Sequence, residues 1–133
     1  TGSTWRKTAF EELETIVSLA PDMGVTSLYS DYVLPIAHHY ERNDLMLQSR
    51  VPYLQVLNEA VPPLGEAVDD WEANRRLAEA ISRRAKERNI KPIQDAVDGR
   101  TVRRDYTKTL ELYTMGGRVN NSKDVAQFII NHC

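Results

Sequence analysis

The stretch "LETIVSLAPDMGVTSLYSDYVLPIA", residues 13–37, holds two short apolar runs with a loop between them. The first run contains the β-branched residues Thr15, Ile16 and Val17 and predicts a buried strand within residues 14–20. "PDMG" then breaks the chain, and "TSLYS" predicts one helical turn. The second run predicts another buried strand over residues 31–37, with Pro35 at a strand end or edge, because proline cannot donate a ladder hydrogen bond.

The elements on either side of these strands follow the order of an α/β layered domain. A short helix is predicted over residues 7–13, with Thr8 as a possible N-cap. A third extended segment is predicted within residues 50–61 and stops at Pro62 and Pro63. The clearest helix of the chain starts at Asp69 or Asp70 and runs to about Glu87.

This long helix has an apolar stripe and a matched charge at each end. The stripe consists of residues at spacings of one, three and four, namely Leu77, Ala78, Ile81 and Ala85. Carboxylates stand at the start of the helix, and the basic residues Arg83, Arg84, Lys86 and Arg88 crowd its end. A nucleic-acid surface is one interpretation of those cations. A solvated helix end that complements the helix dipole is the simpler one.

The second half of the sequence is predicted to be mainly helical. Residues 93–104, "IQDAVDGRTVRR", read as a polar connector. A second amphipathic helix follows, with Tyr106, Leu110 and Tyr113 on one face, and ends at Gly116 and Gly117. A last helix has Asn121 or Ser122 as N-cap and presents Val125, Phe128 and Ile129 on one face.

Composition limits the possible functions. The chain has 133 residues, close to the commonest size of one domain. A net charge of -2 and a pI near 5.9 give no general reason to bind nucleic acid or an anionic membrane. No apolar run approaches the roughly 20 residues of a membrane span, and the N-terminus has no signal-peptide core, so the compartment stays unknown. Cys133 is the single cysteine, which excludes an internal disulfide and a cysteine cluster for a metal.

The obvious metal candidates are weak. His38 and His39 precede Glu41, and on an extended strand the two adjacent imidazoles would point to opposite faces. Only one of them would then share a site with Glu41, so structural, partly exposed histidines are expected here rather than a metal site. No serine lies in a nucleophile elbow, and no glycine-rich loop of the phosphate-binding types is present.

Three polar points remain as candidates for a binding site. Ser18 and Leu19 end the first strand, at the sheet edge where α/β proteins bind ligands. Arg42 follows the second strand, and Asp70 follows the "PPLGEAVD" turn. They would supply backbone donors, a cation for phosphate and a carboxylate for the paired N–H groups of guanine. The alternatives are a strand-end cap, a surface arginine and a helix N-cap.

The order of these motifs resembles the molybdopterin oxidoreductase family. The motifs are "YSDYVLP" at residues 29–35, the Glu41-Arg42 pair, and "PLGEAVDDW" at residues 63–71. The later "RRDYTKTLELYTMGGRV" is similar to the subgroup of nitrate, selenate and chlorate reductases and of ethylbenzene and steroid hydroxylating dehydrogenases. Two positions depart from the family pattern: Ala20 stands where an acid is usual, and Val68 stands where an arginine is usual.

The resemblance implies a fold and a cofactor. Residues 1–90 would form part of a Rossmann-like nucleotide-binding layer of class α/β, and residues 91–133 a helical connector. The cofactor would be molybdenum bis(molybdopterin guanine dinucleotide), with an iron–sulfur cluster elsewhere in the parent protein. Carried over by position, Ser18 and Leu19 would meet the guanine nucleotide, Arg42 would be a basic contact, and Asp70 a nucleotide contact.

The resemblance also implies an activity and partners. The reaction would be oxygen-atom transfer or hydroxylation coupled to electron transfer. The expected partners are the rest of the catalytic subunit, an iron–sulfur electron-transfer subunit and a haem b subunit, in a periplasmic or membrane-associated complex. Family subunits are several times longer than 133 residues, so this chain would be an internal piece, inactive alone. The alternative hypothesis is a small non-catalytic α/β protein-interaction module.

Overall fold

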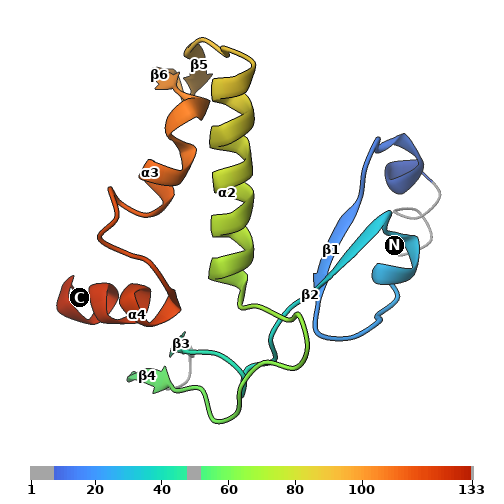
Figure 1. The fold of residues 1–133 in the computed structure, drawn as a ribbon, viewed down its shortest axis with the longest axis vertical. Coiled ribbons are helices and arrows are strands. Elements are labelled where there is room, and N and C mark those ends of the chain that lie inside the picture. The colour runs from blue at the N-terminus through green and yellow to red at the C-terminus, as the bar shows by residue number, and fades with distance from the viewer. Residues whose placement is uncertain (1–7, 48–51, 133) are drawn as a thin grey trace.

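The computed structural model of the chain describes residues 8–47 and 52–132. This part of the chain is a mixed α/β structure with three two-stranded sheets. Figure 1 shows the long helix α2 (Asp70–Glu87) at the centre, with helices α3 (Thr109–Tyr113) and α4 (Ser122–His132) on one side of it and the strands β1 (Val17–Ala20) and β2 (Tyr32–Pro35) on the other. The predicted α/β class is confirmed at the level of a mixed α/β structure. A sheet of more than two strands is absent from the described residues, so the Rossmann-like layer stays a prediction.

The two predicted strands of the opening stretch are present and pair in parallel. β1 (Val17–Ala20) and β2 (Tyr32–Pro35) run side by side, joined by a loop that contains the 3-10 turn η3 (Ser27–Tyr29). Pro35 is the last residue of β2, as its missing N–H requires. The 3-10 turn η2 (Phe10–Glu12) precedes β1 within the predicted first helix, whose Lys7 lies outside the described residues.

The end of this parallel pair leads directly to the start of α2. Ile36 donates its N–H to the carbonyl of Ala20 at 3.2 Å and forms a parallel bridge with Val68. Ala37 then donates to the carbonyl of Val68 at 2.8 Å. Because α2 begins two residues after Val68, these backbone bonds bring two strand ends and a helix start together.

A second, antiparallel pair lies below α2 in Figure 1. β4 (Leu54–Leu57) lies within the predicted third extended segment, and it pairs with β3 (Asp44–Leu47), which the sequence analysis did not predict. β3 also lies against α4 (Ser122–His132). Asn121 accepts the backbone N–H of Asp124 at 2.8 Å, which confirms it as the N-cap of α4.

Helix α2 packs through its small residues. Ala78, Ser82 and Ala85 are buried, and the neighbouring segments are the 3-10 turn η4 (Tyr106–Lys108) and helix α3 (Thr109–Tyr113). The hydroxyl of Ser82 accepts the N–H of Leu110 at 2.9 Å. The predicted apolar stripe is therefore wrong in part. The small side chains permit the close approach of α3 on their face of the helix, and Leu77 lies outside that face and is 58% exposed.

The predicted polar connector is wrong. Residues 93–104 form an antiparallel hairpin of β5 (Ile93–Val97) and β6 (Arg100–Arg104). Asp98 and Gly99 occupy its turn with φ of 48° and 73°, the left-handed conformation that a two-residue hairpin turn requires. The division into an α/β part and a helical part at residue 90 stays a prediction.

The core of the described part is small. Its buried apolar residues are Ile36, Ala37, Ala78, Ala85, Val119 and Ala126. Many large apolar side chains are exposed instead, among them Leu64 at 82% and Val25 at 75%. In the described residues, none of the helices has the length and apolar character needed to cross a membrane.

Candidate functional site

Two of the predicted site residues meet in an ion cluster at the start of α2. Nη1 of Arg42 donates to the carboxylate of Asp70, the first residue of the helix. Nη2 of Arg42 lies 3.1 Å from Oδ2 of Asp44, the first residue of β3, and Nη1 also reaches the carbonyl of Ala37 at 3.5 Å. Arg42 thus joins the strand end, β3 and α2, and one guanidinium faces two carboxylates.

A cavity of about 230 Å³ lies beside this cluster. Its walls come from three segments: residues 42–45, residues 69–71, and the face of α4 that carries Ser122, Val125, Ala126 and Ile129. Asp44, Asp69 and Asp70 outnumber Arg42 there, so the cavity is negative. Such a lining suits a ligand that presents N–H donors and disfavours an anion.

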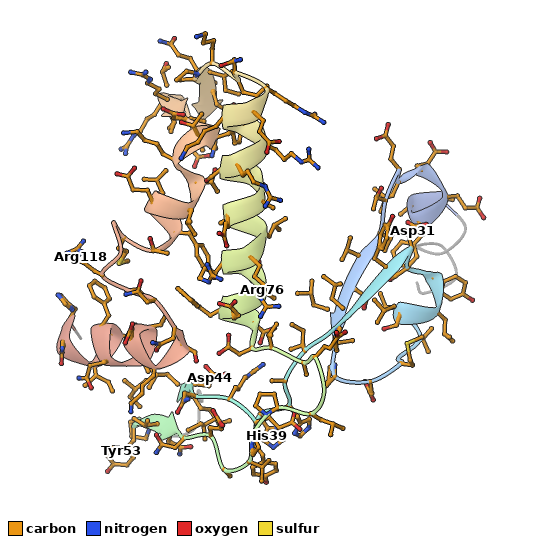
Figure 2. The ribbon with its side chains drawn as sticks, in the orientation of Figure 1. Asp31, His39, Asp44, Tyr53, Arg76 and Arg118 are labelled. Carbon is orange, nitrogen blue, oxygen red and sulfur yellow. The ribbon has the colours of Figure 1, made fainter. Side chains whose placement is uncertain are left out.

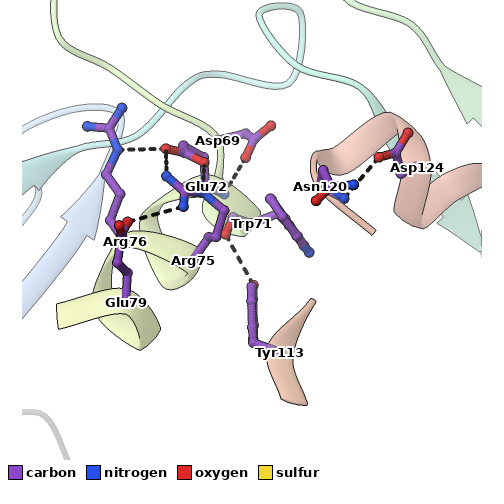
Figure 3. Close-up of polar contacts among 9 residues, drawn as sticks. All are labelled: Asp69, Trp71, Glu72, Arg75, Arg76, Glu79, Tyr113, Asn120 and Asp124. Carbon is purple, nitrogen blue, oxygen red and sulfur yellow. Dashed lines mark hydrogen bonds and ion pairs between the residues drawn. The ribbon is translucent and has the colours of Figure 1, made fainter. Parts of the chain in front are cut away.

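Trp71 forms one wall of this first cavity and is held by α3. Its ring centroid lies 5.4 Å from that of Tyr113, and the Tyr113 hydroxyl donates to the carbonyl of Trp71 at 3.2 Å (Figure 3). Burial raises the pKa of Tyr113, and the charges of Asp69 and Asp70 act in the same direction. The phenol therefore stays protonated and able to donate at neutral pH.

A second cavity of about 710 Å³ lies at the carboxyl end of β2. It is lined by residues 34–36 and 65–68 and by Ala73, Arg76 and Leu77 of α2. Glu66 and Arg76 are its charged residues, and the rest of the lining is apolar side chain and backbone. Its volume lies in the range of small-molecule sites, and the carboxyl end of parallel strands is where α/β proteins bind ligands.

The first turns of α2 carry a network of ion pairs. Glu72 accepts from Arg75 Nε at 2.6 Å and from Arg76 Nε at 2.7 Å, and Arg75 also reaches Glu79 at 3.2 Å (Figure 3). The hydrogen bond from Arg75 is the main reason why the pKa of Glu72 falls from 4.5 to about 2, and burial opposes it. The carboxyl of Asp69 caps the helix by accepting the N–H of Glu72 at 2.7 Å.

The other two predicted site residues lie apart from both cavities. The hydroxyl of Ser18 lies 3.1 Å from that of Ser27, and the side chain of Leu19 is exposed. Neither residue is in the lining of either cavity. The structure thus brings Arg42 and Asp70 together and leaves Ser18 and Leu19 on β1. The cofactor contacts assigned to these four residues stay predictions.

The two histidines are arranged differently from the expectation. β2 ends at Pro35, so His38 and His39 do not alternate across a strand; their ring centroids lie 3.9 Å apart with the planes tilted by 44°, and the rings of His39 and Tyr40 lie 4.2 Å apart, tilted by 43°. Glu41 accepts the backbone N–H of His38 at 2.8 Å. Across the described residues, side chains of the metal-ligating types nowhere gather in a group of three or more.

Arg76 is the cavity residue that the sequence analysis missed. Ala73, Arg76 and Leu77 have the spacing i, i+3 and i+4, which places them on one face of a helix. This spacing was a usable signal, because it puts a cation beside an apolar residue next to the "PLGE" turn. Leu77 was instead predicted to lie on the packed face together with Ala78.

Comparison with known proteins identifies the family of this chain. The family model for molybdopterin oxidoreductase matches residues 3–80. The respiratory nitrate reductase subunit alpha of Haloferax mediterranei is 34% identical over 126 residues, which is 91% of this chain. The dimethylsulfide dehydrogenase subunit alpha of Rhodovulum sulfidophilum is 33% identical over 96% of it, and the chlorate reductase subunit alpha of Ideonella dechloratans is 28% identical over 91%.

The extent of these matches also limits what they show. This chain spans 13% of the length of the Haloferax protein and 14% of the Rhodovulum protein. The family model, however, covers more than half of the chain and contains β1, β2, Arg42 and Asp70. The chain belongs to the molybdopterin oxidoreductase family.

Proposed function

We propose that this chain is part of the catalytic subunit of a molybdenum-dependent oxidoreductase and contributes part of a molybdopterin guanine dinucleotide site. The observation that carries the proposal is the meeting of the β2 end, the Ile36–Val68 bridge and the start of α2, with a cavity on each side of that helix start. In the parent subunit, β1 and β2 would belong to a larger, Rossmann-like sheet.

The residues present fit the organic part of such a cofactor. The acidic first cavity suits the paired N–H donors of a guanine edge, and the second cavity is wide enough for a sugar–phosphate segment. The described residues offer no cluster of metal ligands, so molybdenum would be held by the pterin and by residues elsewhere in the parent subunit. When bound, the molybdenum would supply the oxygen-atom transfer or hydroxylation chemistry, with electrons leaving through iron–sulfur centres.

The four predicted contacts have distinct roles in this proposal. Asp70 accepts from the nucleotide base, and Arg42 fixes the orientation of that carboxylate from the side of β3. Ser18 and Leu19 act through the backbone at the end of β1, where the side chain of Ser18 is already bonded to Ser27. None of these groups carries the redox step; they bind and orient.

The exposed apolar surface supports incorporation into a larger subunit. Leu28 is 69% exposed and Leu64 is 82% exposed, and many other large apolar side chains are exposed as well. Burial of a leucine side chain stabilises a protein by about 1.5–3 kcal/mol, so the rest of the catalytic subunit is the first partner we propose. The relatives are named as alpha subunits, and an iron–sulfur electron-transfer subunit and a haem b subunit are the further partners of the proposal.

The proposal is tested with Asp70→Asn in the parent subunit. This variant keeps the size of the side chain but removes the charge that would hold a guanine edge, and we expect lower molybdenum and guanine content per protein. Asp98→Asn is the control, because asparagine tolerates the left-handed turn conformation and Asp98 lies at the far end of α2. Equal cofactor content in Asp70→Asn and the wild type would reject Asp70 as a contact. A parent protein that carries no molybdopterin would reject the proposal itself.

A further inference from the structure

We propose that Arg76, and the second cavity that it lines, receive the phosphate groups of the bound nucleotide. This inference rests on the proposed function, adds a residue that the sequence patterns did not indicate, and assigns the phosphate contact to Arg76 rather than to Arg42. It would make the start of α2 a divided site, with the base on the acidic side and the phosphates on the side of Arg76.

The first argument is the availability of the two arginines. Both Nη atoms of Arg42 are engaged by carboxylates, so its charge is already balanced by Asp44 and Asp70. Arg76 uses Nε for Glu72, and within the described residues its Nη atoms have no hydrogen bond or ion pair. The Arg76 side chain is 60% exposed, against 24% for Arg42. Arg76 therefore has a free fork of donors, the geometry that matches phosphate oxygens.

The second argument is the charge of the two cavities. The first cavity has three carboxylates and one guanidinium, and it repels an anion. The second has one of each sign, from Glu66 and Arg76, and Arg76 is fixed at Nε by a carboxylate outside the cavity. A phosphate that enters the second cavity meets free guanidinium donors and a weaker opposing charge.

The third argument is position. Arg76 extends from the lower part of α2, in the region between that helix and the β1–β2 pair (Figure 2). Residues 34–36, at the end of β2, form the opposite wall. Gly65, with a φ of 61°, lines the cavity in the turn beside Glu66 without a side chain. Leu34 and Leu77 supply apolar surface for the carbon atoms of a sugar.

The experiment compares two guanine ligands that differ only in their phosphates. GDP and guanosine are titrated by calorimetry into the parent catalytic subunit prepared without its cofactor, for the wild type, Arg76→Gln and Arg76→Lys. We expect Arg76→Gln to weaken GDP binding about tenfold and to leave guanosine unchanged, because the lost contact is charge-assisted and meets only the phosphate. The GDP affinity of Arg76→Lys should lie between those of the wild type and Arg76→Gln, since lysine keeps the positive charge but lacks the two-pronged guanidinium donors.

A matched control and a second variant sharpen the result. Arg84→Gln removes a cation two turns further along the same helix, where the side chain pairs with Glu87, and GDP affinity should not change. Glu66→Gln removes the carboxylate of the cavity and should tighten GDP binding. Circular dichroism checks that each variant keeps its helix content.

The possible outcomes separate this inference from the proposed function. Equal loss of GDP binding in Arg76→Gln and Arg84→Gln overturns the inference, because the effect would be general charge. Unchanged GDP binding in Arg76→Gln also overturns it, as does a wild-type chain that binds no GDP. In each of these cases the molybdopterin content of the wild-type parent subunit still decides the proposed function.

Discussion

The two ends of α2 are built by opposite principles. Its start gathers long-range contacts: Val68 bridges to Ile36, Asp70 pairs with Arg42, and Trp71 packs on Tyr113. Its end carries local ion pairs, such as Arg84 with Glu87, and leads into a hairpin that packs mainly on itself. The charged groups at the start of this 18-residue helix thus pair with a distant segment, and those of its last turn pair within the helix.

This difference shows where a binding site can form. Both cavities adjoin the start of α2, where distant segments meet and leave space between them. The basic end has favourable dipole charge and exposed arginines, and residues 83–88 line neither of these two cavities. If the comparison is correct, substitutions at the start should cost more than similar substitutions at the end.

The largest effect is expected for Trp71→Ala. The Trp71 ring is half-buried between α2 and α3, and its removal should lower the free energy of unfolding of the chain by about 2 kcal/mol, roughly half the cost at a fully buried aromatic site. Urea unfolding followed by circular dichroism measures it. Tyr53→Ala is the control at a 71% exposed aromatic ring and should stay within about 0.5 kcal/mol of the wild type. Equal losses in the free energy of unfolding for Trp71→Ala and Tyr53→Ala would show that the contacts of Trp71 at the start of α2 add no stability.

The next effect is expected for Asp69→Ala. This change removes the carboxylate that caps α2 through the N–H of Glu72, and we expect a loss of about 1 kcal/mol in the free energy of unfolding. Asp69→Asn keeps an acceptor at the cap and should recover most of that loss. An equal loss in Asp69→Asn and Asp69→Ala would show that Asp69 acts through its charge rather than through the acceptor that caps the helix.

These two residues also show how far the sequence alone reaches. The cap at Asp69 and the bounds of α2 depend on neighbours within one turn, and both were predicted. The contact of Trp71 with Tyr113 joins residues 42 positions apart, and no local pattern encodes such a distance. The same reason explains why Arg42 and Asp70 were separate candidates before the structure placed them in one ion pair.

Two errors of the sequence analysis have other causes. The hairpin of β5 and β6 was missed although Asp98-Gly99 is a strong local signal for a two-residue turn, because the polar composition of residues 93–104 was given more weight. Leu77 was assigned to the packed face because its spacing from Ala78, Ile81 and Ala85 predicted one apolar stripe. The face that α3 covers carries Ala78, Ser82 and Ala85, because two helices can approach closely only where their side chains are small.

A pH-dependent effect of intermediate size is expected at Glu72. The pKa of this carboxyl is lower in the folded chain than its ordinary value of 4.5, so its stabilising effect is fully present above pH 4.5 and is lost as the pH falls toward about 2. Glu72→Gln should remove this contribution, worth less than about 1 kcal/mol because the pair is partly exposed. Unfolding measured from pH 6 to pH 2.5 tests it, and identical slopes for variant and wild type would contradict the assignment.

The smallest effect is expected at the other end of the molecule, for Arg104→Ala. Arg104 pairs with Asp95 across the hairpin at 2.6 Å, but both side chains are 44% exposed, and exposed ion pairs contribute about 0.2–1 kcal/mol. We expect a loss of about 0.3 kcal/mol that disappears at 1 M salt, where the Debye length is about 3 Å. A double-mutant cycle with Asp95→Ala isolates the pair from other effects of each substitution. A coupling above about 2 kcal/mol would contradict the assignment of this pair as a weak, exposed one, and the contrast in strength with the contacts at the start of α2 would not hold.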